Sequence, residues 1–528
     1  MASKQAAQPL YSLYGGIFAL TVSLVIVLST LIPAPTAYTP LTKEDIAAYA
    51  PKDGLSDRDI ARYQAIYSLQ KDGNWDEADK VISSLQDTTL LGAVQAQRYL
   101  HQDYVSDYQE LAAWLKQYND MPEAARIYRL AQRKRPVGTL APMRYTTAKA
   151  LTGDGNARKI AGTRPGTFMT GLNYWQRGEL DNALTFFKAA HKHAKGEWHK
   201  AAALYWQARV LHKQGLEEQA QTAFSRAADY PRTFYGLLAA KQTGQATLAR
   251  MDAPSVSAAL LKKPATKRAL AFAAIGKHKR AESELRILFN SVNNAQKAEL
   301  ISLAASLDMP ALQLRLGNHF SYKGAEYDLA NYPAPRWLED SKYLVDPALI
   351  FAIARQESAF RPDVKSYAGA TGVMQLMPAT ARYIIRKEKL DEVEVASLNG
   401  YAPASSISMD KLDDPVVNIT VGQHYITYLR EKSYITDNMI HLLTAYNAGP
   451  GNAIEWQKRF ARVEDPLLFI ERIPFRETRH YVMQVMANYM VYSAMLRNED
   501  TAAAKLIEGE WPRFDTLGQA GDAVSHAG

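Results

Sequence analysis

The sequence predicts an all-α protein with two successive helical regions, and two observations lead to this fold class. A small-residue pattern that joins paired helices recurs through the first 335 residues. Beyond it, apolar residues continue at helical spacing between prolines and glycines that end each helix. At 528 residues the chain is long enough for about three domains, and its apolar fraction of 47% is typical of a globular protein.

Residues 1–40 differ in composition from the rest of the chain. No charged residue occurs between Lys4 and Lys43, and residues 10–32 are almost wholly apolar. About twenty such residues span a bilayer as a helix. A cleaved signal peptide and an uncleaved membrane anchor both fit, and poor cleavage sites near Ala34 and Ala37 favour the anchor. Since no second apolar span follows, we expect the rest of the chain to be exported.

Composition excludes several kinds of site. The chain has no cysteine, which excludes disulfides, thiolate metal sites and a cysteine nucleophile. Its 11 histidines show neither HExxH nor another paired-ligand spacing, and no GxxxxGK[ST] or GxGxxG motif occurs. We therefore expect no metal, no cofactor and no nucleotide chemistry.

The net charge of +8 is unevenly distributed along the chain. Residues 41–335 hold 40 Lys and Arg against 29 Asp and Glu, a net charge of +11, whereas residues 336–500 hold 19 against 21, a net charge of −2. The basic region suggests an anionic polymer as its neighbour, although an ordinary solvated surface explains the charge equally well. Nucleic acid fits badly, because no concentrated Arg/Lys stripe occurs and the chain is expected to be exported.

Helix pairs recur in residues 41–335. A glycine and an alanine five residues apart lie between two helical patterns, where the glycine allows a turn and the alanine lets the second helix approach closely. The pairs are Gly73 with Ala78, Gly178 with Ala183, Gly215 with Ala220 and Gly276 with Ala281, with Asn119 and Ala124 as a degenerate fifth copy. They resemble tetratricopeptide-like repeats at irregular intervals and predict a superhelix rather than an unrelated bundle. The segment NYPAPRW (331–337) marks the predicted domain boundary.

A helix is predicted to begin at Asp346-Pro347 and to end before Pro362. Its apolar stripe, formed by Leu349, Ile350 and Ile353, continues into an acid four residues later. That acid, Glu357, should lie at the rim of the core, where desolvation raises a carboxyl pKa and makes it a proton donor. The alternative is an ion pair with Arg355 or Arg361.

Three later segments place polar residues at turns and helix ends. SYAGATGVMQLMPATA (366–381) holds Gln375 in a glycine-rich turn, where the backbone could approach a ligand. LLTAYNAGPGNAIEW (442–456) presents Tyr446 and Asn447 where a helix stops, and IERIPFRETRHYVMQVMANY (470–489) places acids and a tyrosine at a helix entry. Tyrosines and amides around one carboxylate suit a sugar ligand.

Four of these motifs, ESAF, AGATGVMQLMP, AYNAG and IPFRETRHYV, resemble in this order the signatures of the lytic transglycosylase domain of soluble lytic murein transglycosylases, a family of glycoside-cleaving type 23. The resemblance implies an N-terminal α-superhelical repeat region (41–335), a goose-lysozyme-like helical catalytic domain (336–500) and a C-terminal tail (501–528). It implies a periplasmic enzyme, associated with the inner membrane through the N-terminal helix. Such an enzyme cleaves the β-1,4 bond between N-acetylmuramic acid (MurNAc) and N-acetylglucosamine (GlcNAc) in peptidoglycan and leaves a 1,6-anhydro end.

By the same resemblance, Glu357 is the single catalytic acid/base. The residues around the sugar and peptide are Ser366, Met374, Gln375, Tyr446, Asn447, Glu477 and Tyr481. A muramidase of the same fold would use water and a second acid, for which Asp363 and Glu477 are the candidates. A non-catalytic wall-binding scaffold is the remaining alternative.

The expected partners are peptidoglycan glycan strands and, through the helical repeats, proteins that build or remodel the cell wall. The sequence departs from the family pattern at residues 390–412, which are expected to form an inserted surface loop that influences glycan-length preference.

Overall fold

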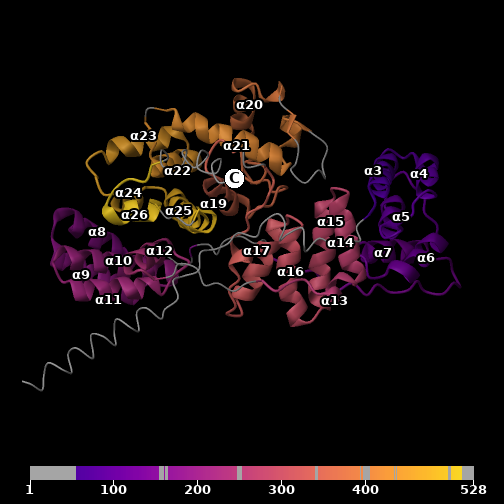
Figure 1. Cartoon of the computed structure of the whole chain (residues 1–528), viewed down its shortest axis with the longest axis horizontal. Coiled ribbons are helices and arrows are strands. Elements are labelled where there is room, and N and C mark those ends of the chain that lie inside the picture. Colours follow the sequence, from indigo (N-terminus) through magenta and orange to yellow (C-terminus); the bar gives the residue numbers. More distant parts are fainter. Residues whose placement is uncertain are drawn as a thin grey trace, which may run out of the picture. The chain divides into compact units, whose positions relative to one another are not determined.

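The computed structural model describes residues 55–153, 160, 164–245, 253–338, 343–392, 394–395, 405–432, 434–435, 437–497 and 501–513 (Figure 1). Within these ranges the chain consists of helices and their connections, with two strands of two residues each. The all-α prediction is therefore confirmed. The predicted signal or anchor at residues 1–40 lies outside the described residues. Among those that are described, no helix is long and apolar enough to cross a bilayer.

Helices of the first region follow one another as paired elements. Those before residue 153 are α3 (Asp57–Lys71), α4 (Trp75–Ile82), α5 (Leu91–Tyr99), α6 (Tyr108–Tyr118) and α7 (Ala124–Lys134). The next group is α8 (Gly166–Arg177), α9 (Leu180–His193), α10 (Glu197–Lys213), α11 (Glu217–Ala228) and α12 (Phe234–Thr243). The third is α13 (Ala258–Leu261), α14 (Pro264–Ala274), α15 (His278–Leu288), η1 (Phe289–Ser291), α16 (Asn294–Ser306), α17 (Pro310–Ser321) and α18 (Asp328–Asn331).

The glycine–alanine pairs join these helices as predicted. Gly73, Gly178, Gly215 and Gly276 all have φ between 75° and 78°, in the left-handed region that glycine adopts without strain. The paired alanines are at most 1% exposed and begin the packing of the second helix; they are Ala78, Ala183, Ala220 and Ala281. The resulting pairs α3–α4, α8–α9, α10–α11 and α14–α15 pack directly on each other.

The stacking order differs from a simple solenoid in which each pair packs on the next in the chain. One hydrophobic core combines residues 63–151 with residues 260–330. The Leu151 amide donates to the Arg286 carbonyl (2.8 Å), and Arg268 pairs with Asp120 (2.9 Å) across the same contact. Helices α8–α12 pack on one another, and α12 also packs on the C-terminal helices α25 and α26. The first helices therefore share their core with residues 260–330, and the connection after α7 runs beside α15.

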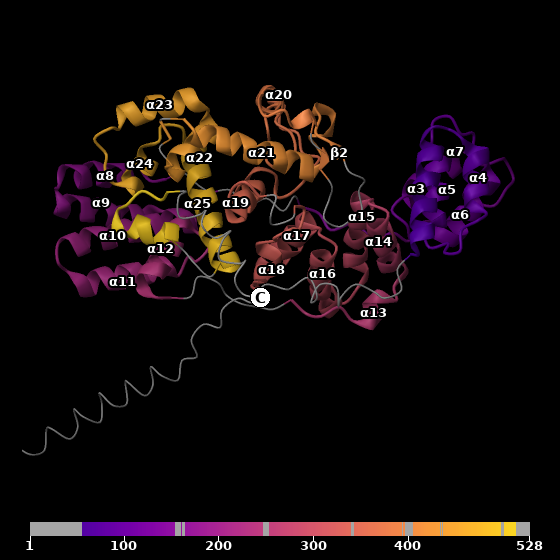
Figure 2. The same ribbon diagram turned by 45° about the horizontal axis from the view of Figure 1, so that its top comes forward.

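The C-terminal region contains α19 (Pro347–Ser358), α20 (Pro378–Lys387), α21 (Pro415–Arg430), α22 (Met439–Ala448), α23 (Pro450–Arg459), α24 (Pro466–Arg472), α25 (Arg476–Arg497) and α26 (Thr501–Glu508). Helix α25 runs alongside α19 and also contacts α22 and α24, so it forms the centre of this region (Figures 1 and 2). Within the expected tail, α26 packs on α12, and the Met439 amide donates to the Pro512 carbonyl (3.0 Å).

Residues 390–412 begin and end on the core. The described part contains η3 (Leu390–Glu392), the antiparallel strands β1 (Glu394–Val395) and β2 (Ser405–Ser406), and η4 (Met409–Lys411). Leu390, Ile407 and Leu412 are buried. The middle of the expected surface loop, residues 396–404, lies outside the described residues.

Candidate active site

Helix α19 presents Glu357 one residue before its end. The Asp346 carboxylate caps the helix by accepting from the Ala348 amide (2.9 Å). The predicted stripe is confirmed, since Leu349, Ile350 and Ile353 are fully buried. The helix stops as predicted before Pro362.

The stop at the end of α19 is made by strained backbone. Ala359 and Phe360 have φ of 53° and 59°, in the left-handed region that non-glycine residues rarely adopt. Both side chains are buried, so packing compensates for the strain and fixes the direction in which the chain leaves Glu357.

The surroundings of Glu357 favour its protonated form. The residue is partly exposed, yet desolvation of its carboxyl group raises the pKa to about 8. The nearby Tyr481 hydroxyl lowers this pKa, and the negative charge of Glu477 raises it. The Tyr481 hydroxyl lies near the carboxyl group, but the geometry falls short of a well-formed hydrogen bond. At neutral pH Glu357 is therefore mostly protonated, as a general acid requires.

The predicted alternative, an ion pair of Glu357 with a neighbouring arginine, does not describe this site. Arg355 donates to Asn488 (2.7 Å) and to the Asn331 carbonyl (2.9 Å), and Arg361 donates to the Ser358 carbonyl (3.0 Å). Both guanidinium groups are thus engaged away from the Glu357 carboxyl group.

The glycine-rich turn after α19 is held together by its own polar groups. The Gln375 amide nitrogen donates to the carbonyls of Val364 (3.0 Å) and Gly372 (2.9 Å), and the Ser366 hydroxyl accepts from the Ala370 amide (3.0 Å). These two predicted site residues therefore shape the turn in this structure. The side-chain amide nitrogen of Gln375 is thus used within the turn, and its role in binding a ligand stays a prediction.

Asn418 of α21 is a structural determinant of this turn that the sequence analysis missed. It is fully buried and accepts from the Met374 amide (2.8 Å), while its amide donates to the carbonyls of Thr371 (3.0 Å) and Leu412 (2.9 Å). Gly372 approaches it so closely that a Cβ atom there would lie 2.1 Å from the Asn418 amide nitrogen. The glycine at position 372 thus allows the Asn418 side chain to lie directly against the turn backbone. An asparagine within the apolar run VVNITV was the signal for it.

Tyr446 links the turn to Glu357. Its hydroxyl donates to the Met374 carbonyl (2.8 Å), and burial together with the nearby Glu357 charge raises the Tyr446 pKa well above its usual value. The Met374 side chain is fully buried and packs against Gly422. Asn447 follows at the end of α22, where Gly449 (φ 84°) stops the helix as predicted, and it is partly exposed.

The entry to α25 carries the last two predicted residues. Glu477 is exposed in the first turn of α25, and its charge acts on Glu357. Tyr481, one turn later, is buried, and desolvation followed by the Glu357 charge raises its pKa well above the usual value. The structure therefore brings Glu357, Tyr446, Glu477 and Tyr481 together, with Met374 joined through its carbonyl. The other candidate second acid, Asp363, is exposed and faces Lys279 (3.6 Å).

A buried carboxylate to which the sequence analysis gave no role holds the segment that leads into α25. Glu471, near the end of α24, is fully buried and accepts hydrogen bonds from Arg164 and from the Tyr235 hydroxyl (2.7 Å). Its partners precede it by 307 and 236 residues, so the helical region holds the segment that leads into α25. The signal was an acid at the end of the apolar run LLFI.

Comparison with known protein families identifies two segments. Residues 338–469 match the model of the transglycosylase SLT domain, and residues 472–500, which include α25, match the soluble lytic transglycosylase helical domain. The soluble lytic murein transglycosylase of Escherichia coli K12 is 29% identical over 424 residues, 79% of this chain and 58% of that protein. That of Salmonella typhimurium is 30% identical over 325 residues, 60% of this chain and 46% of that protein.

Solved structures agree on the fold. The 70 kDa soluble lytic transglycosylase SLT70 from Escherichia coli superposes with a TM-score of 0.52 at 23% identity and covers 94% of this chain and 71% of that one. A complex of the 70 kDa enzyme with bulgecin A gives the same TM-score and identity, over 95% of this chain and 70% of that one. The all-α fold with a superhelical and a lysozyme-like part is thereby confirmed. The chain, which spans less than two thirds of the length of its Escherichia coli relative, is similar to the soluble lytic murein transglycosylases and matches their transglycosylase SLT domain at residues 338–469.

Proposed function

We propose that the chain is a peptidoglycan lytic transglycosylase that cleaves the β-1,4 bond between MurNAc and GlcNAc and forms a 1,6-anhydro-MurNAc end. The observation that carries this proposal is the desolvated carboxyl group of Glu357, with a pKa of about 8, beside Tyr446, Glu477 and Tyr481. Homology to enzymes named soluble lytic murein transglycosylases supplies the substrate class.

In the first step, Glu357 donates its proton to the glycosidic oxygen, and the bond from that oxygen to C1 of MurNAc breaks. Positive charge develops at C1. The N-acetyl group of the sugar and the negative charge of Glu477, exposed nearby, would both stabilise that charge.

In the second step, the C6 hydroxyl of the same sugar attacks C1 and transfers its proton to the Glu357 carboxylate. The bond between C6 oxygen and C1 closes the 1,6-anhydro ring, and Glu357 regains the proton it gave. No water is consumed, so one group acting first as acid and then as base is sufficient.

The other proposed site residues act around this group. Tyr446 and Tyr481 would orient the Glu357 carboxyl group and the N-acetyl group, while Asn447 offers an amide at a partly exposed helix end. Met374, Gln375 and Ser366 would support the sugar site by fixing the turn from Val364 to Leu376.

A hydrolytic muramidase is the alternative, and it needs a second acid to activate water. Asp363 faces Lys279, which favours the transglycosylase, whereas Glu477 keeps the alternative open because its charge reaches Glu357. Mass spectrometry of the fragments released from purified sacculi tests the two reactions. Anhydro ends support the transglycosylase and reducing ends the muramidase. No soluble fragments at all would support a non-catalytic scaffold.

We further propose that residues 336–500 are the catalytic domain and that the helical residues 41–335 contact glycan strands and cell-wall proteins. The chain would act in the periplasm, with the apolar segment at residues 10–32 holding it at the inner membrane.

A further inference from the structure

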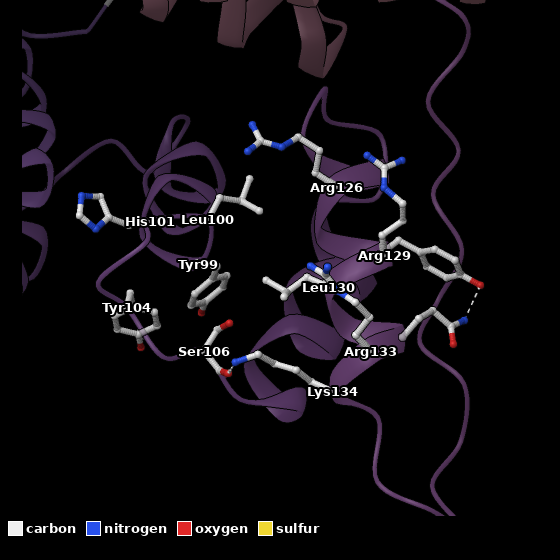
Figure 3. Close-up of a pocket in the computed structure, with 12 residues that line it drawn as sticks. Tyr99, Leu100, His101, Tyr104, Ser106, Arg126, Arg129, Leu130, Arg133 and Lys134 are labelled. Carbon is white, nitrogen blue, oxygen red and sulfur yellow. Dashed lines mark hydrogen bonds between the residues drawn. The ribbon is translucent and has the colours of Figure 1, made fainter.

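A basic cavity of about 640 Å³ lies among the N-terminal helices (Figure 3). This volume falls within the range of ligand-binding pockets. Helix α7 forms one wall, and the chain from the end of α5 to Ser106 forms the other. Four lining residues are cationic, and no acid is among the described residues that line it; the cations are Arg126, Arg129, Arg133 and Lys134.

The spacing of the arginines in α7 determines the cationic wall. Arg126, Arg129 and Arg133 are three and four residues apart and therefore share one helix face, along which they extend over about 10 Å. All three line the cavity, and Figure 3 shows their side chains extending from the helix, with Arg126 directed toward Leu100. The opposite face of α7 holds Ile127 and Ala131 in the hydrophobic core. The core thus fixes the helix, while the three guanidinium groups stay exposed.

Within the described part of the chain, the three guanidinium groups form no ion pair. Several other arginines of the helical region are paired, as Arg98 is with Asp79 (2.5 Å) and Arg280 with Glu123 (2.7 Å). Arg133 lies in the last turn of α7, where a cation interacts favourably with the helix dipole. Like charges three and four residues apart nevertheless repel one another along the helix, and an anionic ligand would relieve that repulsion.

The facing wall is aromatic. Tyr99 and Tyr104 line the cavity opposite α7, with their ring centroids 6.0 Å apart. Tyrosine rings combine an apolar face with a polar edge, and they pack against peptide and sugar groups alike. The cavity therefore offers planar cations on one side and amphipathic rings on the other.

We propose that this cavity binds the carboxylate-bearing stem peptide of a peptidoglycan strand. The identity of the polymer depends on the function proposed above, whereas the charge and shape of the cavity do not. Guanidinium forks match carboxylates in bidentate geometry, and a row about 10 Å long spans roughly three residues of an extended peptide at about 3.4 Å each. The aromatic wall favours such a peptide over a phosphate polymer, which would need only the cations.

Binding to purified sacculi tests the proposal. The full chain carries Glu357→Gln so that binding is measured without digestion, and the test variant adds Arg126→Gln, Arg129→Gln and Arg133→Gln. Lys134 is kept, because it already donates to the Ser106 carbonyl. The matched control replaces three exposed lysines in and after α9 and therefore loses the same charge; its changes are Lys188→Gln, Lys192→Gln and Lys195→Gln.

At low salt we expect the arginine variant to bind sacculi at least tenfold more weakly and the lysine control to bind within twofold of the parent chain. Free stem peptides should displace the parent chain, and 0.5 M salt should narrow the difference between the variants. Equal binding of the arginine variant and the parent would overturn the proposal. Displacement by inorganic polyphosphate but not by stem peptides would replace it with a phosphate-polymer site.

The proposed reaction is tested separately. With Glu357 intact, the chain that carries the three arginine changes should release anhydro products from short soluble glycan fragments at the wild-type rate. If the wild-type chain releases no anhydro products, the proposed function fails, while the binding comparison still decides whether the cavity takes stem peptides.

Discussion

Replacing Glu357 with glutamine should stabilise the folded protein while it abolishes turnover. The folded-state pKa is about 8, against 4.5 for an ordinary glutamate. Between these values the folded state binds a proton that the unfolded state does not, so wild-type stability falls as pH rises. Each pH unit above 4.5 lowers the free energy of unfolding by about 1.4 kcal/mol, which amounts to about 3 kcal/mol at pH 7. Glutamine does not titrate and removes this cost.

The assay is urea unfolding of wild type and Glu357→Gln at several pH values from 5 to 8, with initial rates on sacculi measured in parallel. The stability difference should be small at pH 5 and grow with pH, while turnover of the variant falls by about 10³-fold. The matched control is Glu218→Gln, at an exposed glutamate of α11, and its stability relative to wild type should stay constant. A Glu357→Gln difference that also stays constant with pH would show that the carboxyl group is not desolvated, and the argument for a general acid would fail with it.

Three further predictions follow from the contacts around this group. Glu477→Gln removes a charge that raises the pKa of Glu357, and Tyr481→Phe removes a hydroxyl that lowers it. The alkaline limb of the pH–rate profile should therefore move to lower pH in the first variant and to higher pH in the second, and shifts in the same direction would contradict this. Tyr446→Phe loses a hydrogen bond worth about 1 kcal/mol to the turn and should lower kcat more than it raises KM, whereas unchanged kinetics would reduce the residue to packing. Glu471→Ala leaves its buried partners Arg164 and Tyr235 unpaired and should lower the free energy of unfolding by about 3 kcal/mol. A loss below about 1 kcal/mol would show that apolar packing alone holds the segment before α25.

Local features of this fold could be predicted from the sequence because short-range chemistry determines them. A glycine at a turn and an alanine five residues later define each helix pair, as Gly178 and Ala183 show. The apolar stripe that leads to Glu357 and the stop before Pro362 depend on helical spacing and on proline, and both lie within 16 residues of sequence.

Long-range features could not be predicted in the same way. The pairing of Glu471 with Arg164 joins residues 307 apart, and no local pattern states which arginine will meet a buried acid. The return of the first helices onto residues 260–330 also depends on three-dimensional packing, since each repeat presents a similar apolar face to any neighbour. Asn418 is intermediate: its presence on an apolar face signals a buried role, but its partners in the turn come from the tertiary fold.

The way in which the pKa of Glu357 is set fits a reaction that uses one carboxyl group twice. A group that donates and then recovers a proton works best when its pKa lies near the working pH, because neither form is then too rare. Burial is the largest influence and raises the pKa; Tyr481 and Glu477 act on it in opposite directions. Both come from the start of α25, whose preceding segment is held by Glu471 and its partners in the helical region. The helical region therefore helps to set the pKa of Glu357 through the position of α25, and in the proposed function it would also bind the polymer.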